Sequence, residues 1–168
     1  APPGDTSVLG VQDGIAFLAV REVDPANFES RDHLWRTEGT QAGTLRLTAP
    51  VSLDYLFPDG AITTPVFLDG RLFFAHRREE TGPLELWATD GTEGGTAFVA
   101  VLDVGASATP AAIVPVGSEL LLLLQKFDPL YHLALWKSDG TEAGTVEVEI
   151  FLGSFDFIWA AIPARTFL

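Results

Sequence analysis

A motif built on a Leu-Trp pair and a glycine-threonine turn occurs three times in this sequence, and it limits the possible folds more than any other feature. The copies occupy residues 34–44, 86–96 and 135–145, and the second reads Leu-Trp-Ala-Thr-Asp-Gly-Thr-Glu-Gly-Gly-Thr. Their tryptophans, Trp35, Trp87 and Trp136, are 52 and 49 residues apart. A fixed period of this length is typical of one supersecondary unit that is repeated and stacked.

Each period contains four short apolar or extended runs separated by turn residues. The first runs cover 8–11, 64–68 and 112–116, the second 15–20, 71–75 and 120–124, the third the Leu-Trp pairs, and the fourth 45–47, 97–102 and 146–152. Runs this short between glycines favour strands. The run 119–126 is compatible with a helix when taken alone, but its register against the phenylalanine-rich runs of the other copies favours a strand. We therefore expect four antiparallel strands per period and almost no helix.

The strands place large apolar groups on both faces of each sheet. Leu34 is followed by Trp35, and Leu72 by Phe73 and Phe74. Because successive strand residues point to opposite faces, both faces need cover. Four-stranded sheets stacked around an axis provide that cover, so the prediction is an all-β, propeller-type fold. A β-sandwich or barrel is the alternative.

The second copy resembles the bacterial repeat family named for its Glu-Leu-Trp-x-x-Asp-Gly-Thr signature, which is found in large exported proteins. Residues 85–92 match every position of the signature. The first copy has His33 and Glu38 at the Glu and Asp positions, and the third has Ala134 at the Glu position. The resemblance implies a propeller-like fold and an extracellular or cell-surface location, and it assigns no chemistry to particular residues.

The repeat predicts a single domain made of blades at 6–53, 62–103 and 109–152, with a partial fourth blade at 155–168. Three blades are too few to close a ring, and an uncovered strand ending in Phe167 and Leu168 would invite pairing with another chain. Three explanations remain open: two chains that form a six-bladed ring with an exchanged terminal strand, a piece of a larger propeller, or an open stack capped by a partner. We expect a homo-oligomer or a larger propeller.

The composition limits the classes of partner that the chain is expected to bind. The 168 residues carry 10 Lys+Arg and 23 Asp+Glu, a net charge of −13, which disfavours nucleic acid and anionic surfaces. The longest aliphatic run, 120–124, is too short to span a bilayer, so we expect no membrane insertion. Cysteine is absent, which excludes disulfides and thiolate sites. The chain begins Ala-Pro-Pro-Gly-Asp without methionine, which fits removal of a leader and a secreted or surface protein.

The repeated turn between the third and fourth strands is interpreted as structural. Aspartate and threonine oxygens bond nearby backbone, and glycine accepts positive φ. The residues concerned are Glu38, Gly39, Thr40, Asp90, Gly91, Thr92, Asp139, Gly140 and Thr141. A calcium loop using Asp90 with Glu93 and Asp139 with Glu142 is the alternative; no metal or other cofactor is predicted. Trp35, Trp87 and Trp136 are expected in the core between blades.

Ligand binding is expected at the opposite rim, which is made by the loops between the second and third strands and by the connections between blades, because varied loops on a rigid scaffold commonly carry function. The candidate residues come from the loops between the second and third strands. These loops are predicted at 21–33, 76–84 and 125–132. Their histidines are expected to be solvated rather than joined in a metal or catalytic cluster. The candidate ligand-binding residues are His33, His76, Arg77, Arg78, Tyr131 and His132.

No catalytic residue is predicted, because phosphate loops, nucleophile elbows and His-Glu-x-x-His are absent from the sequence. The leading hypothesis is a secreted or surface-displayed binding module that engages a protein or glycan. An extracellular hydrolase that acts on a polymer through channel-facing carboxylates is the first alternative. A structural spacer or assembly unit is the second.

Overall fold

The computed structural model describes residues 6–23, 26, 30–47, 65–77, 82–103, 108–127 and 130–152. Within them the chain forms three antiparallel sheets of four strands each, and no helix. The first sheet contains β1 (Thr6–Gln12), β2 (Ile15–Val23), β3 (Ser30–Thr37) and β4 (Leu45–Arg46). The second contains β5 (Val66–Leu68), β6 (Arg71–Arg77), β7 (Leu84–Thr89) and β8 (Ala97–Asp103). The third contains β9 (Thr109–Val116), β10 (Glu119–Phe127), β11 (Tyr131–Ser138) and β12 (Val146–Leu152).

The second and third strands pair in the same register in all three sheets. Each motif tryptophan lies opposite an apolar residue of the preceding strand, in the pairs Leu18–Trp35, Phe74–Trp87 and Leu122–Trp136. In every sheet the strands follow one another in chain order as neighbours. Positions can therefore be matched between sheets by counting from the tryptophan.

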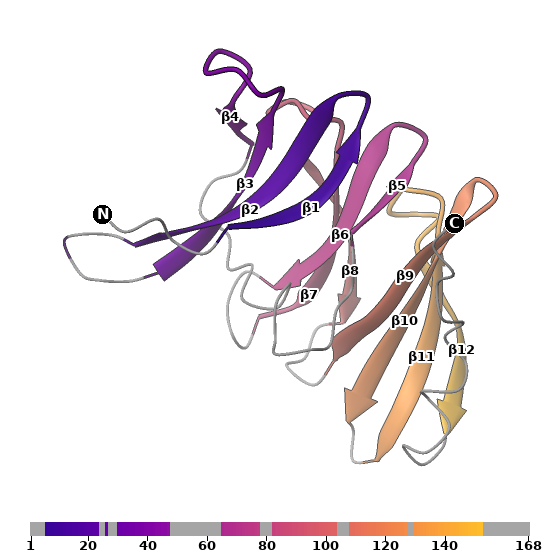
Figure 1. Cartoon of the computed structure of the whole chain (residues 1–168). Coiled ribbons are helices and arrows are strands. Elements are labelled where there is room, and N and C mark those ends of the chain that lie inside the picture. The colour runs from indigo at the N-terminus through magenta and orange to yellow at the C-terminus, as the bar shows by residue number, and fades with distance from the viewer. Residues whose placement is uncertain are drawn as a thin grey trace, which may run out of the picture.

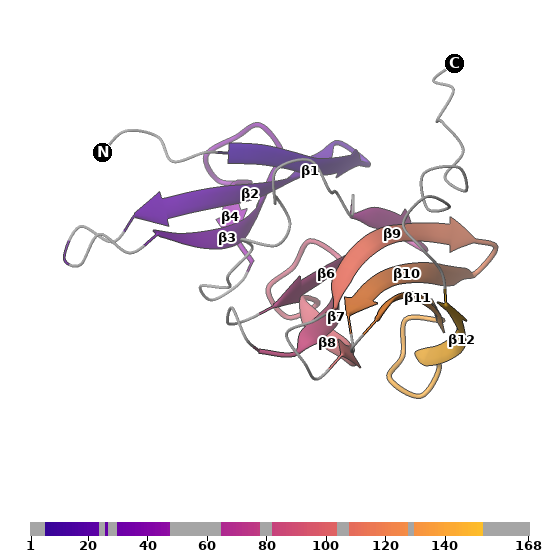
Figure 2. The same cartoon turned by 90° about the horizontal axis from the view of Figure 1, so that it is seen from below.

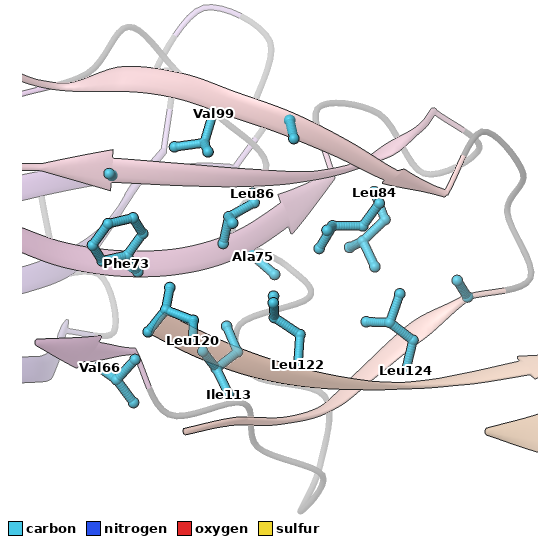
Figure 3. Close-up of a cluster of buried hydrophobic side chains, with 14 of the residues drawn as sticks. Val66, Phe73, Ala75, Leu84, Leu86, Val99, Ile113, Leu120, Leu122 and Leu124 are labelled. Atoms are coloured by element: carbon cyan, nitrogen blue, oxygen red, sulfur yellow. The ribbon is translucent and has the colours of Figure 1, made fainter. Parts of the chain in front are cut away.

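The sheets lie one after another, with the second between the other two (Figures 1 and 2). One buried cluster joins the first and second sheets through residues such as Phe17, Leu34 and Phe74. A larger one joins the second and third sheets, where Leu86 and Leu122 lie in the same cluster (Figure 3). Because strand side chains alternate between faces, the middle sheet buries both of its faces and each outer sheet directs one face toward it.

The predicted strands and the lack of helix are confirmed for the described residues. The run 119–126, which is compatible with a helix in isolation, lies in strand β10. None of the described sheets closes on itself as a barrel. No helix in the described ranges has the length and hydropathy to cross a membrane.

The loops between the second and third strands are shorter than predicted. Cross-strand pairs Arg21–Asp32 and Glu22–Arg31 extend β2 and β3 into the expected 21–33 loop. Similarly, β10 and β11 pair as far as Phe127 and Tyr131. The predicted blade margins at 48–53 and 62–64 and the partial blade 155–168, with Phe167 and Leu168, lie outside the described residues.

Candidate functional site

The Asp-Gly-Thr turns between the third and fourth strands of each sheet hold themselves together by side-chain hydrogen bonds. In the second sheet, Asp90 Oδ1 accepts hydrogen bonds from the Thr92 backbone N–H and hydroxyl, both at 2.8 Å. Thr92 Oγ1 accepts from the Gly95 N–H at 2.9 Å, and the Thr96 hydroxyl donates to the Thr92 carbonyl at 2.7 Å. The third sheet repeats this arrangement around Asp139. The signature residues of these two copies are thus engaged within their own turns.

The turn hydrogen bonds also change the acidity of the two aspartates. The Thr92 hydroxyl and then its N–H lower the pKa of Asp90, and Thr141 lowers the pKa of Asp139 in the same order. In the described residues no group of three or more His, Cys, Asp or Glu side chains is placed to hold a metal ion. The turn carboxylates therefore act as hydrogen-bond acceptors in this structure.

The first turn keeps the threonine contacts without the aspartate. Thr37 and Thr44 hydroxyls lie 2.7 Å apart, and the Gly43 N–H donates to Thr40 Oγ1 at 3.0 Å. Glu38, which takes the aspartate position, instead pairs with Arg36. The turn shape therefore does not need the carboxylate to bond the following threonine.

Two of the turns rest on the preceding sheet. A Cβ added to Gly91 would lie 3.3 Å from Phe17 Cζ, and one added to Gly140 would lie 3.0 Å from Phe73 Cζ. Arg36 Nη1 also donates to the Gly91 carbonyl at 3.1 Å. These turns are therefore joints between sheets.

The tryptophans differ in their polar partners. Trp87 Nε1 donates to Glu85 Oε2 at 2.8 Å, two residues earlier on the same face of β7. The corresponding residues in the other sheets, His33 and Ala134, make no such bond, and Trp35 and Trp136 have buried Nε1 atoms without a hydrogen-bond partner in the described structure. The Glu of the signature is thus the acceptor for the indole of its own copy.

Trp87 and Trp136 pack against the two clusters between sheets. Trp35 lies next to Leu34 on β3, and Leu34 belongs to the cluster facing the second sheet. By strand alternation Trp35 therefore points to the other face of the first sheet.

The histidines do not form one site. His33 and His76 are only 4% and 1% exposed, so the expectation of solvated histidines is wrong for these two. His76 lies against Phe74 and Trp87, with Nε2 3.8 Å from Glu85 Oε2. His33 Nε2 lies 3.7 Å from Glu22 Oε2 on the paired strand. Burial follows from their positions inside the extended strands rather than in loops.

The other predicted rim residues divide between the described and undescribed chain. His132 is half-buried, with Nδ1 3.1 Å from the Leu130 carbonyl oxygen. Arg77 ends strand β6. The Arg77 side chain and all of Arg78 lie outside the described structure.

An exposed apolar group lies at the end of the β10–β11 hairpin, opposite the β9–β10 turn (Figure 1). Phe127 and Tyr131 are 51% and 54% exposed, and their ring centroids are 4.7 Å apart. Leu130 beside them is 70% exposed. We call these three residues the aromatic tip. Sequence reasoning selected Tyr131 and missed Phe127 and Leu130, although large apolar residues on both sides of Asp128-Pro129, a turn-type pair, could have indicated them.

The aromatic tip stands on a fixed hairpin. Strands β10 and β11 pair continuously over eight positions, ending at Phe127–Tyr131. Next to the tip, Lys126 Nζ lies 3.5 Å from Asp103 Oδ1 of the second sheet and 3.4 Å from Glu147 Oε2. Its ammonium also lies 5.8 Å from the centre of the Trp136 ring. These contacts attach the base of the hairpin to the neighbouring sheet and strand, so the tip is presented on a braced support.

Comparison of the chain with protein-family models, curated proteins and solved structures found no match in any of the three.

Proposed function

We propose that this chain is a propeller-type binding module, secreted or displayed on a cell surface, that engages a protein or glycan partner through the aromatic tip. The supporting observation is the exposure of Phe127, Leu130 and Tyr131 together at one end of a braced hairpin. Single exposed apolar residues are ordinary, but a contiguous group is typical of an interaction site. Tyrosine and phenylalanine offer flat apolar faces at low entropic cost, which suits stacking on a sugar ring or on an apolar side chain.

The arrangement of the sheets supports the propeller part of the proposal. Each sheet has four antiparallel strands in chain order, and consecutive sheets pack face to face. The first strands of neighbouring sheets also lie together, since β5 contacts β9 and a Cβ on Gly10 of β1 would meet Phe67 of β5. A radial stack requires the first strands of its sheets to converge. The secreted or cell-surface location, and assembly as a homo-oligomer or as part of a larger propeller, also belong to this proposal.

The shifted carboxyl groups do not favour the hydrolase alternative. A general acid in glycoside hydrolysis needs a raised pKa. The pKa values of Asp90 and Asp139 are instead lowered, by hydrogen bonds inside their own turns. Neither turn carboxylate therefore suits the role of general acid, and the proposal of binding rests on the exposed aromatic tip.

A double variant of the tip tests this proposal. The intact chain is screened on an immobilised glycan panel and against a panel of purified extracellular proteins, and Phe127→Ser with Tyr131→Ser is compared with wild type on each hit. Val116→Ser is the matched control, because Val116 is equally exposed at the opposite end of the same sheet. Loss of binding by more than about tenfold in the double variant only is the expected result, since central aromatic contacts commonly contribute at least that much.

Absence of any hit for the folded wild-type chain, or equal affinity of the double variant and wild type, would refute the proposal. Retention of binding to glycans with loss for proteins, or the reverse, would identify the ligand class.

A further inference from the structure

The faces of the three sheets can be compared position by position, because their registers match. Phe17, Ala19 and Leu34 of the first sheet face the second sheet and are buried. The corresponding Phe73, Ala75 and Leu86 of the second sheet face the third sheet and are also buried. Each interface thus uses the same three positions on the earlier sheet.

In the third sheet these positions are Leu121, Leu123 and Leu135, and all three are only half-buried. They lie on the face opposite Leu120, Leu122 and Ala134, which belong to the cluster with the second sheet. Cross-strand neighbours on this outer face are also apolar: Val114 pairs with Leu121, and Phe151 pairs with Leu133. Val114 and Phe151 are exposed. We call this surface the trailing face.

The first sheet has the complementary surface. In the second and third sheets, the residues that meet the preceding sheet are buried, such as Phe74 and Leu122. Their counterpart in the first sheet, Leu18, is half-buried, and Val8, which pairs with it, is exposed. Val11 on the same strand is exposed as well. We call this surface, which also carries Trp35, the leading face.

The turns show the same difference between the internal interfaces and the two outer faces. Gly91 and Gly140 each lie against a phenylalanine of the preceding sheet, whereas a Cβ on Gly39 would meet nothing within 4 Å. Leu121 occupies the position of those phenylalanines in the third sheet. Lys137 follows Trp136 as Arg36 follows Trp35, and Arg36 donates to the Gly91 carbonyl of the next sheet. The Lys137 side chain is instead 44% exposed and pairs with Glu119.

From these observations we propose that the trailing face of one chain binds the leading face of a second copy of the same chain, which continues the sheet stack across two molecules. In this contact the Gly39 turn of the second copy lies on Leu121, and Lys137 donates to the Gly39 carbonyl oxygen. The two internal interfaces supply the template, because the positions they bury are the ones that no other described sheet covers at the two ends of the stack. A second contact of the same kind between the two copies gives a closed pair with six sheets, within the usual range of propellers.

The charge of the chain adds a condition. Each copy carries a net charge of −13, so association brings together like charges. Added salt screens that repulsion. The pair is therefore expected to become tighter as ionic strength rises, which is opposite to the behaviour of a contact made by complementary charges.

Solution mass and a mixing experiment test the proposal. The wild-type chain is measured by sedimentation velocity over a concentration series at low and high salt, and a species of twice the 18.1 kDa chain mass is expected. Leu135→Asp blocks the trailing face, and Val8→Asp with Val11→Asp blocks the leading face. Each alone is expected to weaken pairing by about tenfold or more, as expected for a charge placed in an apolar contact. Val101→Asp serves as the control, because Val101 is exposed on β8 of the second sheet, which forms neither of the two outer faces.

Mixing the two blocked variants distinguishes the head-to-tail contact from a symmetric one. A trailing-face variant and a leading-face variant still share one intact interface, so the mixture is expected to form heterodimers more readily than either variant forms homodimers. Circular dichroism establishes that each variant is folded. If Leu135→Asp does not fold, Lys137→Glu and Phe151→Ser replace it, because both side chains are already exposed.

A wild-type chain that stays monomeric at every concentration and salt level would overturn the proposal. Pairing that the folded variants leave unchanged, or a mixture with no recovery, would overturn it too. The proposal goes beyond ligand binding at the aromatic tip. Phe127 and Tyr131 lie on the same face of the third sheet as Leu123 and Leu135, but beyond the positions that the two internal interfaces bury. Phe127→Ser with Tyr131→Ser is therefore expected to leave the mass unchanged, so either proposal can fail alone.

Discussion

The three turn glycines offer a comparison in which backbone strain is constant and the contact between sheets varies. Gly39, Gly91 and Gly140 have φ angles of 80°, 87° and 84°. Alanine at any of them meets the same left-handed penalty, about 1–2 kcal/mol. Differences among the three alanine variants therefore report what surrounds each turn.

Those surroundings predict an order of destabilisation. A Cβ at Gly140 would lie 3.0 Å from Phe73 Cζ and 3.3 Å from its Cε1, and Phe73 is buried between two sheets. Since this ring has little room to move, Gly140→Ala adds an overpacking cost of about 1–3 kcal/mol to the strain. Gly91→Ala adds less, with one contact of 3.3 Å to Phe17, and Gly39→Ala adds none.

Urea unfolding followed by circular dichroism measures this order, at a protein concentration low enough for the chain to be monomeric. The m-value should be equal in all three variants, so that midpoint shifts report stability. In thermal unfolding the extra cost at Gly140 corresponds to a further decrease in Tm of about 2–12 °C. Equal destabilisation by Gly39→Ala and Gly140→Ala would refute the contact between the turn and the preceding sheet.

Three further predictions concern buried contacts and pH. Leu86→Ala, at a fully buried position, should lower the free energy of unfolding in urea by about 2–5 kcal/mol. Leu135→Ala, at the matching half-buried position of the third sheet, should lower it by less than half as much in the monomer. Equal losses would contradict the exposure of the trailing face. Glu85→Ala should cost about 1–3 kcal/mol by removing the acceptor of the partly buried Trp87 indole N–H. Glu85→Gln should recover part of this loss because the amide oxygen can accept; identical losses would argue against the hydrogen bond. The native pKa values of Asp90 and Asp139 lie below the unfolded value near 3.8, so their contribution to stability is complete above that pH and is lost as the pH falls through the native values. The stability of Asp90→Asn with Asp139→Asn should therefore depend less on pH below about pH 4 than that of the wild type, as measured by acid unfolding. An unchanged pH dependence would contradict the turn hydrogen bonds.

The strands could be predicted from the sequence because the same pattern occurs three times. The run of leucines in β10 has no alternation that would distinguish it from a buried helix segment. Its alignment with the glycine-bounded runs of the other copies identified it as a strand. Repetition therefore supplied the information that the local pattern lacked.

The ends of the strands and the burial of polar side chains were harder to predict. The pairs Arg21–Asp32 and Glu22–Arg31 extend β2 and β3 through residues whose polar side chains resemble a loop. His76 is buried because Phe74 on its own strand and Glu85 and Trp87 on the paired strand β7 surround it. Such environments depend on cross-strand pairing, which hydrophobic patterns along the chain do not encode.

For the aromatic tip it was exposure, rather than burial, that the sequence did not predict. Phe127 and Leu130 are apolar, and apolar residues beside a strand are usually read as core. Their exposure depends on how far the β10–β11 hairpin extends past the neighbouring sheet, which is a tertiary property. The trailing face was likewise visible only after the register had matched Leu121 with the buried Phe17 and Phe73.

A double-mutant cycle across the first and second sheets tests the central claim, that the repeated sheets stack face to face. The rings of Phe17 in β2 and Phe67 in β5 meet edge to face, with centroids 5.8 Å apart. The unfolding free energies of Phe17→Leu, Phe67→Leu and the double variant should give a coupling of about 0.5–1.5 kcal/mol. The control pair Phe17→Leu and Tyr131→Leu, in the first and third sheets, should be additive to within about 0.5 kcal/mol. A Phe17–Phe67 coupling no larger than that of the control would contradict the stacking of the sheets.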